Sequence, residues 1–255
     1  MKLVTLNLRH DANRWPERAG LIVEELMREQ PDVIALQEVA LAIEQAQFIA
    51  RQLALCLPGQ QYSVRVEPKR GLLPKEGIAL LSRLPVVEHA RIDLPEGKRV
   101  AQYIRVEQDD QPYDIVNLHL HHRPHDNESI RLPQVQHLLG WMYTGRQPVL
   151  RRWIVAGDFN AAPGSATIAA LRKHLESAYA AVHGREPEHT APTPLRAEEY
   201  SETWASTIDY IFFDSAALRV ESARLAFNQP DPDDETLYPS DHFGLIAEFV
   251  PPGGA

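Results

Sequence analysis

Polar side chains that could do chemistry gather at the ends of the strands that the sequence predicts. They are Asn7, Glu38, His119, Asp158 with Asn160, Asp209, and Asp241 with His242. Charged groups are seldom fully buried without partners. An α/β scaffold presents its sites at strand ends. These positions therefore predict one shared polar site.

The residue types of this site favour phosphoester hydrolysis with a hard cation. Carboxylate and amide oxygens are the ligands for Mg²⁺ or Mn²⁺. A bound metal can polarise a phosphoryl oxygen and offset developing negative charge. A histidine beside a carboxylate supplies an oriented, positively charged donor. A neutral amide such as Asn160 can hold a phosphate oxygen or a water without adding charge.

Strands and helices, which are recognised by their different spacing of apolar residues, must hold these residues in place. Alternating or short apolar runs predict strands, at residues 4–8, 32–37, 62–66, 78–82, 86–92, 100–106, 113–120, 152–157, 208–213, 218–225 and 243–250. Apolar residues at helical spacing predict helices, at residues 19–27, 42–57 and 128–143 and after a Ser165 cap, with Ile168, Leu171 and Leu175 on one face. Residues 183–202 and 228–240 are expected to be irregular.

Many of these strands follow one another with only short turns, which indicates antiparallel pairing. We therefore expect one α/β domain over residues 1–250 and a frayed tail over residues 251–255.

The composition excludes several classes of protein. The chain of 255 residues is 44% hydrophobic, which excludes disorder. Its single cysteine, Cys56, excludes a disulfide scaffold. We expect Cys56 to be a packed, inert thiol. The net charge of -9 argues against a broad basic nucleic-acid surface but not against a local pocket. No apolar run approaches the roughly 20 residues of a membrane span. With no signal peptide visible, we expect a cytoplasmic protein.

Taken in order, seven short motifs resemble the endonuclease/exonuclease/phosphatase superfamily, the DNase I-like group. The motifs are Asn7, Leu36-Gln37-Glu38, residues 77–83, Asn117-Leu118-His119-Leu120, Gly157-Asp158-Phe159-Asn160, Ile208-Asp209-Tyr210 and Ser240-Asp241-His242. The resemblance runs from residue 3 to about residue 249. The opening residues resemble a small bacterial branch of this group.

The resemblance implies an α/β (α+β) fold of four layers, with two mixed β-sheets packed face to face and helices outside. It implies that Glu38 is the principal metal ligand, with Asn7 beside it. It also implies that Asp241 can reach this metal or a second one. The cofactor is expected to be Mg²⁺ or Mn²⁺.

The remaining roles also follow from the resemblance. Asp158 would orient or deprotonate the attacking water, and Asn160 would position the phosphate or that water. His242, held by Asp209, would stabilise the pentacovalent phosphoryl group. His119 would contact the phosphate near the leaving group. The expected reaction is in-line attack by water on a phosphodiester, without a covalent enzyme intermediate.

The chain departs from two branches of the superfamily. Arg9 and His119 stand where the AP endonuclease branch carries an acidic residue and a tyrosine. Residues 203–209 differ from the segment typical of inositol polyphosphate 5-phosphatases. The substrate class therefore stays open among a small molecule, a lipid headgroup and a nucleic acid, and a DNA or RNA nuclease is the main alternative. The oligomeric state also stays open.

The sequence disfavours two further alternatives. The His119–His125 cluster superficially resembles the H-x-H-x-D-H motif of zinc hydrolases, but Arg123 and Pro124 occupy the places where Asp and His are required. A non-enzymatic interaction protein on the same fold is disfavoured because Glu38, Asp158 and His242 are all present. The leading hypothesis is a divalent-metal-dependent phosphoester hydrolase whose clustered acids need a cation.

Overall fold

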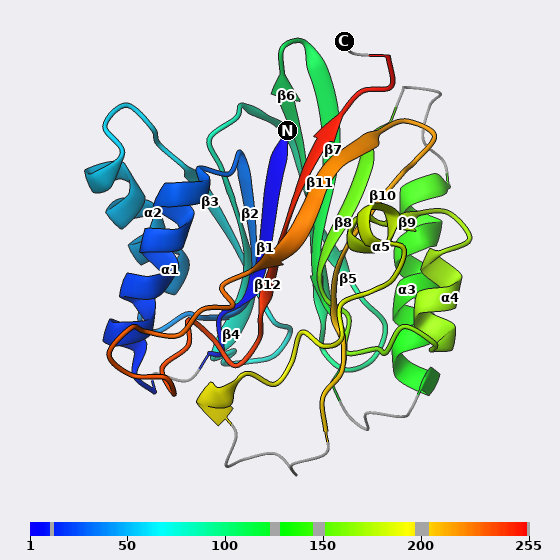
Figure 1. Ribbon diagram of the computed structural model, residues 1–255. Helices are drawn as coiled ribbons and strands as arrows, with labels where there is room; N and C mark the ends of the chain where they lie inside the picture. Colours follow the sequence, from blue (N-terminus) through cyan, green and yellow to red (C-terminus); the bar gives the residue numbers. More distant parts are fainter. Residues whose placement is uncertain (11–12, 123–127, 145–150, 197–203, 254–255) are drawn as a thin grey trace.

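Two six-stranded sheets pack against each other, with helices on the outer faces (Figure 1). The computed structural model describes residues 1–10, 13–122, 128–144, 151–196 and 204–253. The strand orders are β11-β12-β1-β2-β4-β3 and β5-β6-β7-β8-β10-β9. Each sheet is mixed, because β1 and β2 pair in parallel, as do β7 and β8, while the other pairs are antiparallel. The predicted fold class is therefore confirmed.

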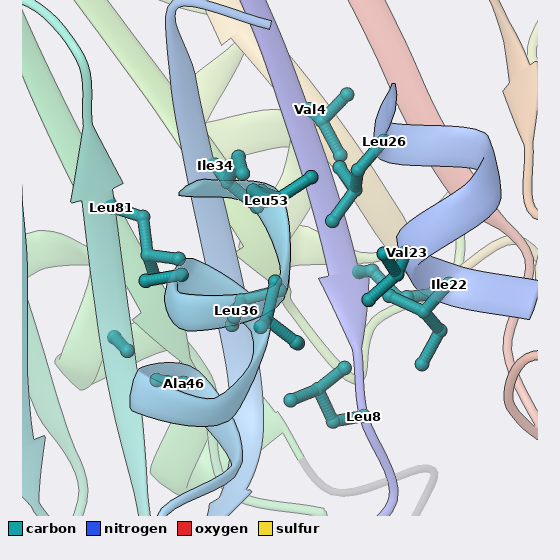
Figure 2. Packing of buried hydrophobic residues seen from close by; sticks show 14 of the residues in the cluster. Val4, Leu8, Ile22, Val23, Leu26, Ile34, Leu36, Ala46, Leu53 and Leu81 are labelled. Atoms are coloured by element: carbon teal, nitrogen blue, oxygen red, sulfur yellow. The ribbon is translucent and has the colours of Figure 1, made fainter. Parts of the chain in front are cut away.

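The first sheet carries two helices on its outer face. Its strands are β1 (Lys2–Asn7), β2 (Val33–Ala40), β3 (Ser63–Pro68), β4 (Glu76–Ser82), β11 (Arg219–Ala226) and β12 (Gly244–Val250). Helices α1 (Trp15–Glu29) and α2 (Gln45–Cys56) each present an apolar stripe to it. Figure 2 shows Val23 and Leu26 of α1 and Leu53 of α2 packed over Val4 and Ile34.

The second sheet has its own covering layer. Its strands are β5 (Val86–Asp93), β6 (Val100–Gln108), β7 (Gln111–His119), β8 (Trp153–Asp158), β9 (Glu176–Ser177) and β10 (Asp209–Phe213). Side chains of α3 (Glu128–Tyr143) and α4 (Ala166–Leu171) join the hydrophobic cluster on its outer face. A third cluster, including Leu3, Ala35, Ile115 and Ile154, fills the space between the sheets. Among the described residues, no helix is long and apolar enough to cross a membrane.

Several predicted elements differ in detail. Ser165 caps α4, since its Oγ accepts a hydrogen bond from Ile168 N at 3.2 Å, but α4 ends at Leu171, so that Leu175 is buried outside the helix. Helix α5 (Ala178–His183), strand β9 and a short 3-10 turn at Pro194–Arg196 were not predicted. The prediction of a packed Cys56 is wrong: it is the last residue of α2 and is exposed.

Candidate active site

A bulge in β2 places Glu38. The pairing of β2 with β4 shifts register between Leu36 and Val39, and Glu38 has a φ of 49°, in the left-handed region. Such bulges redirect a side chain at the expense of ladder hydrogen bonds. The prediction that the strand ends just before Glu38 is therefore wrong, because β2 continues to Ala40. The left-handed backbone conformation therefore falls at Glu38, the residue that is expected to be the principal metal ligand.

Asn117 of β7 supports this bulge from the opposite sheet. Its buried Nδ2 donates to Leu36 O and to Ala79 O, both at 2.9 Å. Its Oδ1 accepts from Gln37 Nε2 at 2.7 Å. A single amide therefore satisfies backbone carbonyls of both β2 and β4 beside the bulge and couples the two sheets next to Glu38.

The structure brings the eight predicted site residues together around one pocket of about 420 Å³. Of these, the ones that line it are Glu38, His119, Asp158, Asn160, Asp241 and His242. Asn7 and Asp209 lie behind the wall, where Asn7 bonds to Asp158 and Asp209 bonds to His242. Two of the pocket's lining residues, His119 and Asp158, are the last residues of the neighbouring strands β7 and β8.

Asp158 ends β8 and is buried among donors. Asn7 Nδ2 donates to its Oδ2 at 3.0 Å, and the backbone N–H of Asn160 donates to its Oδ1 at 2.8 Å. Burial and the negative charge of Asp209 raise the pKa of Asp158 to about 7, although His242 and Asn160 oppose the shift. A carboxylate poised near neutral pH is suited to exchanging a proton with water.

Asp209, at the start of β10, holds His242. Its Oδ2 lies 2.9 Å from His242 Nδ1 and accepts from Thr190 Oγ1 at 2.6 Å. Burial alone would lower the pKa of His242, but the charge of Asp209 and this hydrogen bond raise it well above the usual value. His242 is therefore an imidazolium held at a fixed angle. The structure describes no hydrogen-bond partner for the buried Asp209 Oδ1.

Thr190 completes this group and was missed in the sequence. Its Oγ1 also accepts from the backbone N–H groups of Ile208 and Asp209, at 3.0 and 3.1 Å. Its carbonyl accepts from Phe243 N at 2.7 Å, directly after His242. A threonine in a segment expected to be irregular gave no signal for this role.

Glu38 remains ionised although it is only 24% exposed. Burial would raise the pKa of its carboxyl, but the hydrogen bond from His10 lowers it well below the usual value. His10 Nδ1 lies 2.7 Å from Glu38 Oε2 and 3.6 Å from Glu76 Oε2. These three side chains can approach one ion, since their ligand atoms lie within 4.8 Å of one another.

Asp241 has a different environment from Glu38. Its Oδ2 accepts from Arg196 Nη1 at 2.8 Å, and its Oδ1 accepts from Ser240 Oγ at 3.2 Å. A guanidinium therefore already compensates its charge. Asn160 has a φ of 49° and donates through Nδ2 to Leu120 O at 3.2 Å, which fixes its amide at the pocket wall.

Arg99, which the sequence did not single out, lies between two histidines of the His119–His125 cluster that the sequence disfavours as a zinc site. Its guanidinium contacts Nδ1 of His119 at 3.1 Å and Nδ1 of His122 at 3.2 Å. A cation on these nitrogens opposes zinc there. His121 has a buried Nδ1 without a partner in the described chain, and His125 lies outside the described residues.

Comparison with known proteins identifies the class. A family model described as the Endonuclease/Exonuclease/phosphatase family matches residues 4–242, and the chain belongs to this family. Endonucleases, exonucleases and phosphatases all hydrolyse phosphoester bonds, so the chain is an enzyme of the phosphoester hydrolase class. The resemblance drawn from the motifs is confirmed.

Particular relatives can be named. Nocturnin of Xenopus laevis is 28% identical over 261 residues, which cover 94% of this chain and 66% of the relative; for Nocturnin of Homo sapiens the covered share is 59%. The chain thus spans about two thirds or less of these relatives. The structure of the human Nocturnin catalytic domain with bound sulfate is 26% identical, with a TM-score of 0.77, covering 98% of this chain and 93% of that one.

A more distant structure shares only the fold. Danio rerio TDP2 complexed with single-strand DNA product is 19% identical, with a TM-score of 0.76, covering 98% of each chain.

Proposed function

We propose that this enzyme is a divalent-metal-dependent phosphodiesterase that works by in-line attack of water. The observation that carries the proposal is the convergence of the eight sequence-predicted residues on one pocket, with an ionised Glu38 facing an imidazolium at His242. That combination offers a cation ligand and an anion-stabilising donor in one site.

The donor set fits a hard cation. Glu38 would hold the ion, because its carboxylate is ionised, lines the pocket and is partly exposed. Asn7 Oδ1 accepts one bond, from Arg9 N at 3.0 Å, and an amide oxygen has a second lone pair for a ligand. Asp241 already accepts bonds from Arg196 and Ser240, so it is a weaker candidate ligand than Glu38. Oxygen ligands favour Mg²⁺ or Mn²⁺, and such an ion would polarise a phosphoryl oxygen when bound.

The protein's own residues then divide the remaining work. Asp158 orients or deprotonates the attacking water, and its pKa of about 7 supports this role. His242, held by Asp209, places positive charge against the pentacovalent phosphoryl group. Asn160 positions the phosphate or the water, and His119 contacts the phosphate near the leaving group.

The substrate is a phosphodiester in a small molecule, a lipid headgroup or a nucleic acid. The net charge of -9 favours a local contact with one phosphate over a long polyanion. A nuclease is the second candidate, because the family that matches residues 4–242 includes endonucleases and exonucleases. Matched panels of DNA, RNA, phospholipid and nucleotide substrates separate these classes.

The test is hydrolysis of bis-p-nitrophenyl phosphate with Mg²⁺ or Mn²⁺, before and after chelation. We expect activity to disappear with EDTA and to return with the metal. Glu38→Ala should abolish activity, and His242→Ala should lower kcat by about 10²–10³-fold, as for a lost transition-state donor.

Matched controls are Glu24→Ala and His137→Ala, which remove exposed residues of the same types on α1 and α3. Both controls should keep full activity. Full activity in both Glu38→Ala and His242→Ala would overturn the assignment.

A further inference from the structure

A buried guanidinium in the pocket wall has no role in the proposed reaction. Arg99 lies one residue before β6 and is 5% exposed. Its Nη1 lies 3.1 Å from His119 Nδ1, and its Nη2 lies 3.2 Å from His122 Nδ1. One fork therefore reaches two imidazoles that line the pocket.

The chemistry of this contact fixes the proton on His119. A guanidinium has only donors and stays protonated at any ordinary pH. His119 Nδ1 must therefore accept, which leaves Nε2 as the protonated nitrogen of the neutral ring. Burial and the charge of Arg99 also lower the pKa of His119 well below its usual value, which agrees with a neutral ring.

The protonated nitrogen faces the reaction centre. His119 Nε2 lies 3.4 Å from Asp158 Oδ2, the carboxylate that we place beside the attacking water. His119 is buried at the end of β7, which pairs with the end of β8 at Asp158. The ring thus points an N–H at the same part of the pocket as Asp158.

Neighbouring charges explain why a buried arginine is tolerated. Glu76 Oε1 lies 3.4 Å from Arg99 Nη1 and 2.9 Å from Lys69 Nζ. A buried charge needs a hydrogen-bonded partner of opposite sign. Glu76 therefore compensates the charge of Arg99. The guanidinium can then donate to His119 without needing a second carboxylate as its partner.

We propose that Arg99 is a positioning residue that fixes His119 as a neutral imidazole with its proton on Nε2, making His119 a hydrogen-bond donor to a phosphate oxygen of the substrate. The contact to substrate rests on the proposed function, whereas the tautomer does not. A neutral donor of this kind passes no proton to the leaving group, because losing the Nε2 proton would leave an imidazolate. The proton that the leaving oxygen gains must come from another group or from water.

The primary experiment is ¹⁵N NMR of the imidazole nitrogens in the whole, metal-free protein at pH 7, with His119 assigned by the signals lost in His119→Gln. We expect an unprotonated Nδ1 and a protonated Nε2. An imidazolium, or a proton on Nδ1, would overturn the proposal. This measurement needs no substitution at Arg99.

Substitution then tests the positioning. Arg99→Met should shift the His119 signals toward a tautomer mixture and lower kcat by about 10–100-fold, the usual effect of losing an orienting partner, with a smaller change in KM. Arg99→Lys, which keeps a donor, should recover most of the His119 tautomer and most of kcat. The control is Arg152→Met, which removes another buried arginine that bonds to Pro112 O and Gln111 Oε1, away from His119.

Unchanged His119 signals in Arg99→Met would refute the positioning role, and the same shift in Arg152→Met would reduce it to a general packing effect. If Arg99→Met does not fold, the wild-type spectrum and Arg99→Lys decide. If the wild-type tautomer is as expected but no phosphodiester is hydrolysed with any metal, the proposed function fails and the inference about Arg99 stands.

Discussion

Replacement of Asn117 by leucine should both destabilise the protein and disable its pocket. Asn117 is fully buried on β7 and makes three hydrogen bonds to the other sheet, two of them to the carbonyls of Leu36 and Ala79. Leucine has nearly the same shape, so the change removes the bonds without opening a cavity for water. The effect can therefore be assigned to the bonds and not to lost volume.

The magnitude follows from which groups lose their partner. Gln37 Nε2 keeps bonds to Thr5 Oγ1 and Ala35 O, so it stays satisfied. The two carbonyls lose the donor that Asn117 supplied, and at about 0.5–1.5 kcal/mol for each hydrogen bond lost the sum is about 1–3 kcal/mol. That is a substantial part of the roughly 5–15 kcal/mol of a typical domain.

The kcat of Asn117→Leu should fall even under conditions in which the variant is still folded. The bonds lie beside the bulge that aims Glu38, and a displacement of about 1 Å at a catalytic site costs on the order of 10²-fold in rate. Urea denaturation gives the free energy of unfolding, and kcat is measured where the variant is still folded. Asn228→Leu, at a partly exposed asparagine, is the control and should stay within about 0.5 kcal/mol. A loss below about 1 kcal/mol in Asn117→Leu together with unchanged kcat would refute the reasoning.

Two other perturbations test the scaffold around the site. Thr190→Val keeps the shape of the side chain but removes the acceptor for Ile208 N and Asp209 N. Urea denaturation should therefore show a free energy of unfolding lower by about 1–3 kcal/mol, and kcat should fall. Thr190→Ser should retain the stability and kcat of the original protein. Equal behaviour of the two variants would contradict the role of the hydroxyl. Far from the pocket, burial raises the pKa of Glu25, although its bond from Phe227 N opposes this. The folded chain then binds this proton more tightly than the unfolded chain, so its contribution to stability falls as pH rises from about 4.5 through the folded-state pKa. Urea midpoints measured from about pH 4.5 upward should decline less in Glu25→Gln than in the original protein. The same decline in both proteins would contradict this role of Glu25.

The fold class could be predicted from the sequence because it depends on local patterns. The residues named for the site came from the same patterns, and their catalytic and metal-binding roles stay predictions. Buried strands such as β8 appear as apolar runs, and Asp158 and Asn160 follow directly after one. The joint order of the short motifs then adds specificity that no single motif has.

What the sequence could not predict depends on contacts between distant segments. The bulge at Glu38 depends on the register between β2 and β4, which no local pattern encodes. Thr190 acts through Asp209, 19 residues away, and Arg99 acts through His119, 20 residues away and on a neighbouring strand. In each case the residue type is common and only its position in space gives it a role.

Pairing of charges in the structure sharpens the expectation that clustered acids need a cation. The four acids of the site are Glu38, Asp158, Asp209 and Asp241. Of these, Asp209 faces His242 and Asp241 faces Arg196, so these two already have positive partners. In the described chain Glu38 forms an ion pair with the partly exposed His10, and Asp158 faces His119, which the guanidinium of Arg99 holds neutral. Asp158 lies near the imidazolium of His242 and has a pKa of about 7, so the fixed negative charge without a buried cation beside it is concentrated at Glu38. A divalent ion on the Glu38 side would offset it and leave His242 and the His119 N–H directed at the substrate phosphate, which is the division of labour that in-line hydrolysis requires.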